Sequence, residues 1–229
     1  MNIPRRSFLR SSLLLGSGAL LTTLTARAAA AEPPATETDF WGVIRSRRSV
    51  RRFRPDPVPD AEIEKMVAAA ATAPSSGGQR PWKFLVVRDR ARIDAMREAC
   101  VRRALARYDQ GGGKPEGRAE AETGFRNRIG GYFTAPAFIV VLTDNQSRYP
   151  SYAHWDGPLA AGYLLLAARA LGYGTVFITD SIPDEVTREV LRIPDRYTRV
   201  CITPVGVPVE WPAPHADGQA GDFVAYESL

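Results

Sequence analysis

The chain has 229 residues, a formal net charge of +5 and 45% hydrophobic residues. Four arginines and no acidic residue lie within residues 1–31, so the rest of the chain carries only +1. Such a small charge removes the main support for nucleic-acid binding. Cys100 and Cys201 do not have the spacing of a metal site, and a disulfide between them stays open. About 198 residues remain after residue 31, which suits one domain with a sizeable core.

Residues 1–31 have the three parts of an export signal. Arg5-Arg6 opens it and is followed by Ser-Phe-Leu, a modest apolar run extends from Leu13 to about Leu24, and residues 26–31 are rich in alanine. The paired arginines are typical of the twin-arginine route. The apolar run is shorter than the ~20 residues that span a bilayer, so we expect cleavage and no stable membrane insertion afterwards. The protein is therefore expected in the periplasm or otherwise outside the cytoplasm.

Helices and strands are expected to alternate after a Pro- and Thr-rich, flexible lead-in over residues 32–38. Apolar spacing predicts helices over residues 39–47, 60–73, 90–108, 119–132, 158–171 and 183–191. Strands are predicted over residues 82–87, 137–142, 175–178 and 199–207. This alternation favours an α/β or α+β arrangement around one sheet, with residues 39–229 as a single domain.

The predicted helix over residues 158–171 is apolar on nearly every side, which favours a buried position. His154, Trp155 and Asp156 precede it. They could form a catalytic cluster, but we expect a loop and a helix start instead, with Asp156 as the cap.

Two segments carry candidate chemistry. The first, residues 45–53, reads RSRRSVRRF, and its closely spaced guanidiniums with a hydroxyl suit a phosphate. The second, residues 73–82, reads APSSGGQRPW; its glycines let the backbone approach a planar ligand, and its hydroxyls can bond a heteroaromatic edge. Taken alone, the first is better interpreted as a solvated basic turn, because basic runs are common, and the second as an ordinary helix–strand loop.

Together, the two segments resemble the nitroreductase family. The pattern Arg-Arg-Ser-x-Arg-x-Phe is followed by Pro-Ser-Ser-Gly and then by Arg-Pro-Trp-Lys-Phe-Leu-Val-Val. Residues 156–174 are similar to the buried interface helix of the family, and residues 204–208 to its last core strand. The resemblance extends over nearly all of residues 39–210.

The resemblance implies an α+β, three-layer fold in which helices flank a central mixed or antiparallel sheet. It also implies a homodimer with FMN at the subunit interface. Residues of the first segment would face the phosphate and ribityl chain: Arg47, Ser49 and Arg51, with Arg48 adjacent. Residues of the second would line the isoalloxazine ring: Pro74, Ser75 and Ser76, with Gly77, Gly78 and Arg80. The backbone of Thr179 and Asp180 would lie near the reactive nitrogen of the flavin.

This chain departs from the family pattern at three places. Gly78 stands where an Asn that bonds the polar edge of the flavin is usual, and Arg80 where a Gln is usual. A positive charge at Arg80 would stabilise a reduced, anionic flavin. Residues 209–222 contain no Lys or Arg, although the family tends to carry a basic pair there.

The implied function is an FMN-dependent oxidoreductase in which the flavin performs the chemistry and no protein nucleophile is required. Electrons would pass from a donor, NAD(P)H or another reductant, to a nitroaromatic, a quinone or another small oxidised molecule. Two alternatives stay open. One is a different flavin reaction on the same fold, such as dehalogenation or flavin breakdown, and the other is an exported flavin- or ligand-binding protein without turnover.

The export expectation has a direct test. Replacement of Arg5 and Arg6 by Lys should leave the precursor in the cytoplasm, because the twin-arginine route reads the arginine pair. Cell fractionation and the mass of the mature protein would measure this, with cleavage expected between Ala29 and Glu32. Unchanged export of the double variant would contradict the assignment.

Overall fold

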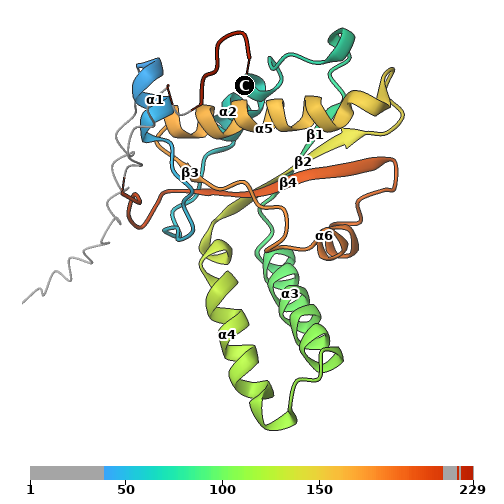
Figure 1. Ribbon diagram of the computed structural model, residues 1–229. Helices are drawn as coiled ribbons and strands as arrows, with labels where there is room; N and C mark the ends of the chain where they lie inside the picture. Colours follow the sequence, from blue (N-terminus) through green and yellow to red (C-terminus); the bar gives the residue numbers. More distant parts are fainter. Residues whose placement is uncertain (1–38, 214–220, 222, 229) are drawn as a thin grey trace, which may run out of the picture. The chain divides into compact units, whose positions relative to one another are not determined.

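The computed structural model describes residues 39–213, 221 and 223–228 (Figure 1). The predicted signal and lead-in, residues 1–38, lie outside the described residues. The helices are α1 (Phe40–Ser46), α2 (Asp60–Ala70), α3 (Arg90–Gln110), α4 (Arg118–Gly130), α5 (Ala153–Ala170) and α6 (Asp184–Leu191). The strands are β1 (Trp82–Val87), β2 (Ala137–Asp144), β3 (Gly174–Thr175) and β4 (Tyr197–Gly206).

The four strands form one antiparallel sheet in the spatial order β1-β2-β4-β3. Strand β2 pairs with β1 on one side, where Trp82 lies opposite Thr143, and with β4 on the other, where Ala137 lies opposite Val205. An isolated parallel bridge between Ser49 and Thr175 continues the pairing beyond β3.

Both faces of the sheet are covered, because β2 is apolar at every position from Ala137 to Leu142 and successive side chains point to opposite faces. Its odd-numbered residues pack with α2 and α5, whereas its even-numbered residues pack with α3, α4 and α6. Figure 1 shows the same division, with α1, α2 and α5 on one side of the sheet and the other three helices on the opposite side. The predicted three-layer α+β fold is confirmed.

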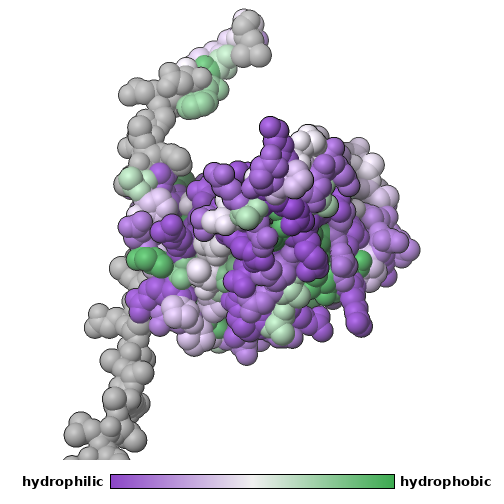
Figure 2. Space-filling model, turned by 90° about the horizontal axis from the view of Figure 1, so that it is seen from below, coloured by the Kyte–Doolittle hydropathy of each residue, from purple (hydrophilic) through white to green (hydrophobic). Residues whose placement is uncertain are grey.

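Helices α3 and α4 form a hairpin that projects from the sheet (Figure 1). Seen from below in Figure 2, this side of the molecule carries mostly hydrophilic side chains, with apolar surface between them. None of the helices in the described ranges is long and apolar enough to cross a membrane.

The third strand is shorter than the predicted 175–178. Ile178 still exchanges backbone hydrogen bonds with Ile202, so the register continues past β3. In an antiparallel strand, every second residue directs its N–H group to the same neighbouring strand. Ile202 directs its N–H to Ile178, so the next N–H toward this segment would come from residue 204. That residue is Pro204, which has no N–H. The ladder is therefore interrupted opposite Val176.

The two cysteines are both buried and free, and they lie in the two different cores. The sheet thus separates them, and the disulfide that the sequence left open does not form. Burial raises the pKa of Cys100 to about 11 and that of Cys201 to about 12, so both stay neutral thiols.

Candidate functional site

The first predicted segment leaves α1 and runs along the edge of the sheet. Val50 N donates to Thr175 O at 2.9 Å and Arg54 N to Val207 O at 2.8 Å. The side chains of Val50 and Phe53 are buried, whereas Arg51 is exposed and Arg47 is half-buried. Apolar anchors therefore hold the backbone in place while the charged groups between them stay near the surface.

Arg48 is the most buried arginine of this segment, with 9% of its surface exposed. Its Nη2 donates to the carbonyl of Ala213. Its Nε and Nη1 are buried and have no hydrogen-bond partner among the described residues. A buried donor without a partner costs about 1–3 kcal/mol, more when it is charged. An anionic group such as a phosphate would satisfy these donors, so the residues present fit the predicted phosphate site.

Two further residues, Arg169 and Trp211, contact this region and were not predicted from the motif. Arg169, in the last turn of α5, is 8% exposed and donates from Nε to Ser46 Oγ at 2.9 Å. Its guanidinium lies 4.2 Å from the ring centroid of Trp211. The C-terminal segment, which lacks Lys and Arg, thus contributes an aromatic ring and the Ala213 carbonyl. The sequence signal for Arg169 was its position as the single charged residue within 158–171.

The second predicted segment is a tight loop between α2 and β1. Residues Ser76–Gly78 form a 3₁₀ turn in which Gly77 has φ +57°. A Cβ on Gly77 would lie 2.5 Å from the Tyr149 ring, so this position requires glycine. Ser75 Oγ accepts a hydrogen bond from Arg80 N at 2.9 Å. Pro74, Gly78 and Arg80 are exposed, and nothing lies within 4 Å of the place of a Gly78 Cβ.

Asp156 holds this loop, contrary to its predicted role as a helix cap. Helix α5 begins at Ala153, so Asp156 lies in its first turn with only 2% of its surface exposed. Its carboxylate accepts hydrogen bonds from Ser76 N at 2.9 Å, Ser76 Oγ at 3.3 Å and Gln79 Nε2 at 2.6 Å. The loop, not the helix, uses this carboxylate.

The two segments lie at opposite ends of α5. Asp156 ties the second segment to the first turn of the helix, and Arg169 ties the first segment to the last turn. At 1.5 Å per residue, these two positions are separated by about 20 Å along the helix. A single chain therefore does not bring the two segments together.

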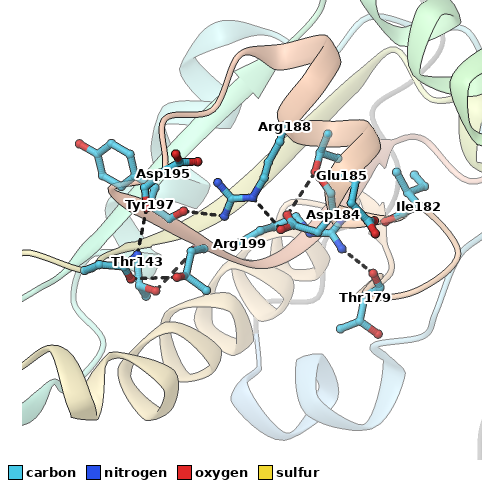
Figure 3. A network of polar contacts seen from close by, with 12 residues as sticks. Thr143, Thr179, Ile182, Asp184, Glu185, Arg188, Asp195, Tyr197 and Arg199 are labelled. Carbon is cyan, nitrogen blue, oxygen red and sulfur yellow. Dashed lines mark hydrogen bonds and ion pairs between the residues drawn. The ribbon is translucent and has the colours of Figure 1, made fainter.

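A third element is the loop that contains Thr179 and Asp180, both of which are exposed. Figure 3 shows Thr179 beside Arg199. Arg199 of β4 reaches under it, with a side chain that is only 6% exposed. Its Nη2 donates to Thr179 O at 2.5 Å and its Nη1 to Ile182 O at 2.6 Å. Its Nε lies 3.2 Å from Asp184 Oδ1, and burial lowers its pKa. Asp184 also receives a hydrogen bond from Arg188 Nε at 2.7 Å. Arg199 lies in a predicted strand and was not among the predicted site residues.

Within the described residues, no group of three or more His, Cys, Asp and Glu side chains could hold a metal ion. The candidate site consists of guanidiniums, hydroxyls and backbone groups, which suit an organic anion. Thr179 and Asp180 supply exposed backbone on a loop that Arg199 holds in one conformation.

The Arg199 contacts predict a large effect on stability. Arg199→Met removes the donors to two carbonyls and one partner of Asp184, so the free energy of unfolding should fall by about 3–5 kcal/mol, as when a buried ion pair is broken. Arg196→Met is the matched control, because Arg196 pairs with Asp144 at the surface and is 48% exposed. This control should lose less than about 1 kcal/mol. Urea unfolding would measure the free energies of unfolding of both variants, and amide exchange would measure the protection of residues 179–183. Equal losses of stability in the two variants would contradict the role of Arg199 in holding this loop.

The chain is similar in sequence and in fold to known proteins. The model of the Nitroreductase family matches residues 44–207. A protein of Archaeoglobus fulgidus, named for an NADH dehydrogenase/NAD(P)H nitroreductase activity, is 34% identical over 172 residues, which cover 72% of this chain and 83% of that protein. The 5,6-dimethylbenzimidazole synthase of Rhodospirillum rubrum is 32% identical over 174 residues, covering 72% and 79%.

Among solved structures, an FMN-dependent nitroreductase from Clostridium difficile superposes with a TM-score of 0.61 at 26% identity, over 82% of this chain and 99% of that chain. The family match covers more than half of the sequence and includes both predicted cofactor segments, residues 45–53 and 73–82, and the Thr179–Asp180 loop. The chain therefore belongs to the nitroreductase family.

Proposed function

We propose that this protein is an FMN-dependent oxidoreductase. The single observation that carries the proposal is the buried guanidinium of Arg48, with two N–H donors that no described residue accepts. Family membership and the FMN dependence of the similar Clostridium difficile enzyme support it. FMN held at this site would supply the redox chemistry, a two-electron transfer from a donor such as NAD(P)H to an oxidised small molecule.

The protein's own residues bind and orient the cofactor. Arg47, Arg48 and Arg51 supply the positive charge for the phosphate, and Ser49 supplies a hydroxyl to the same region. The loop from Pro74 to Gly78 offers small residues and backbone to the isoalloxazine ring. Arg80, exposed at the end of that loop, favours the anionic reduced flavin by its charge.

The cofactor segments lie about 20 Å apart along α5, so one flavin can use both only if a second copy of the chain supplies one of them. Helix α5 and the turn before it present an exposed apolar stripe at helical spacing: Tyr152, Trp155, Leu159 and Tyr163. A continuous exposed stripe of this kind marks an interaction surface. We infer a homodimer in which two α5 helices pack antiparallel about a twofold axis, so that the first turn of one lies beside the last turn of the other.

The electron donor and the acceptor are proposed from the family resemblance and from the expected export. Nitroaromatics and quinones are the acceptors that the resemblance implies, and export would favour a reductant other than NAD(P)H, since nicotinamides are cytoplasmic. A second candidate is a different flavin reaction on the same fold, favoured by the similarity to the 5,6-dimethylbenzimidazole synthase. Export by the twin-arginine route fits either reaction, because that route carries folded proteins with their cofactor inserted.

Cofactor titration tests the phosphate site. Arg47→Ala and Arg51→Ala should each weaken FMN binding by about ten- to a hundredfold, because a charged hydrogen bond contributes roughly 1.5–3 kcal/mol. Arg48→Ala should weaken FMN binding to a similar degree, because Nε and Nη1 of Arg48 are already buried and have no described partner. Riboflavin, which lacks the phosphate, should bind the wild type and the variants alike.

Quenching of flavin fluorescence would give these dissociation constants. Arg52→Ala is the matched control, since Arg52 is a neighbouring exposed arginine outside the predicted set. Wild-type FMN affinity in all three variants would place the phosphate elsewhere. An absence of preference for FMN over riboflavin in the wild type would favour the binding protein without turnover.

A further inference from the structure

A cavity of about 460 Å³ lies between the α3–α4 hairpin and the loop before α6. This volume is within the range of small-molecule sites. Asp180 and Ser181 form part of its wall, so the cavity adjoins the loop that the proposed function places near the reactive nitrogen of the flavin. The cavity lies within one chain and does not depend on a partner subunit.

The charged groups of the cavity are mainly positive. Its lining includes Arg103, Arg107 and Arg128 but a single acidic residue, Asp180. Arg103 is paired with Glu185 at 2.6 Å. No hydrogen bond or ion pair joins the guanidinium of Arg107 or of Arg128 to any described residue, and both residues are exposed. Glu185, the partner of Arg103, is close enough to Arg107 for the two charges to interact. Two guanidiniums are therefore available to an anionic ligand.

The remaining wall is aromatic and apolar. The Phe125 ring lies 5.7 Å from the guanidinium carbon of Arg128, which orients that arginine along the ring. Tyr108 is held by a hydrogen bond from its hydroxyl to Lys114 O at 3.0 Å. Cys100 contributes a neutral thiol, because burial raises its pKa to about 11. Apart from Asp180, no lining group opposes a negative ligand.

We propose that this cavity selects aromatic anions, such as aromatic carboxylates, as the electron acceptors of the enzyme. Phe125 and Tyr108 both offer ring surface to an aromatic ligand, and the paired N–H donors of Arg128 or Arg107 suit a carboxylate. The position beside Asp180 would keep such a ligand next to the flavin. The inference rests on the proposed function for the role of the ligand as electron acceptor and for its position beside the flavin.

Isothermal titration into the oxidised, FMN-loaded protein measures the charge preference without turnover. The ligands are 4-nitrobenzoate and 4-nitrobenzamide, which have nearly the same shape and differ in charge. We expect the carboxylate to bind about tenfold more tightly, the effect of one charged hydrogen bond. Arg128→Gln, or the double variant Arg107→Gln/Arg128→Gln, should bring the ratio near one.

Arg102→Gln is the matched control, because Arg102 lies on α3 outside the cavity and undergoes the same loss of charge. It should keep the wild-type ratio. Equal affinities in the wild type, or an unchanged ratio in the double variant, would overturn the proposal. Loss of FMN from Arg128→Gln but not from Arg102→Gln would also overturn it, since that arginine would then hold the cofactor.

Flavin absorbance of the purified wild type tests the proposed function separately. If the protein binds no FMN, the proposed function fails, and the same titration on the flavin-free chain still decides the charge preference of the cavity.

Discussion

The buried carboxylate of Asp156 and the buried guanidinium of Arg169 lie in the first and last turns of one helix, and each holds a different one of the two predicted cofactor segments. Helix α5 is rigid because its inner face packs on the sheet through Ala161, Leu164 and Ala168. The spacing between the two segments is therefore set by the length of this helix. The proposed homodimer depends on two features. One is this spacing, which one flavin can bridge only with a second chain, and the other is the exposed apolar stripe on the outer face of α5.

Buried charge is concentrated where the site is built. Arg48, Asp156, Arg169 and Arg199 each lose most of their contact with water, and each is oriented toward a loop rather than toward the apolar cores. Three of them are satisfied by groups of the chain itself, which holds those loops in place. Arg48 keeps two buried donors, Nε and Nη1, that no described residue accepts, which is the arrangement expected of a ligand-binding arginine.

Local sequence patterns identified most of the fold. Strand β1 was predicted with its observed ends, and β2 and the helices within a few residues, because apolar periodicity is a local property. The residues that were missed depend on distant partners. Asp156 had the local features of a cap, Arg199 is indistinguishable by sequence from a solvated strand residue, and the shortening of β3 depends on Pro204 in another strand. Gly77 was named from its loop motif, and the structure adds that the need for glycine there comes from Tyr149.

The central claim is that each flavin site uses the first segment of one chain and the second segment of another. A heterodimer purified through two different tags, one chain carrying Arg47→Ala/Arg51→Ala and the other Gly77→Val, tests it by FMN content. If the sites are shared, one site of the heterodimer has both lesions and the other has none, so it should bind about one FMN per dimer while each parent homodimer binds little. If both segments act within one chain, every site carries a lesion, and a heterodimer without FMN would contradict the account.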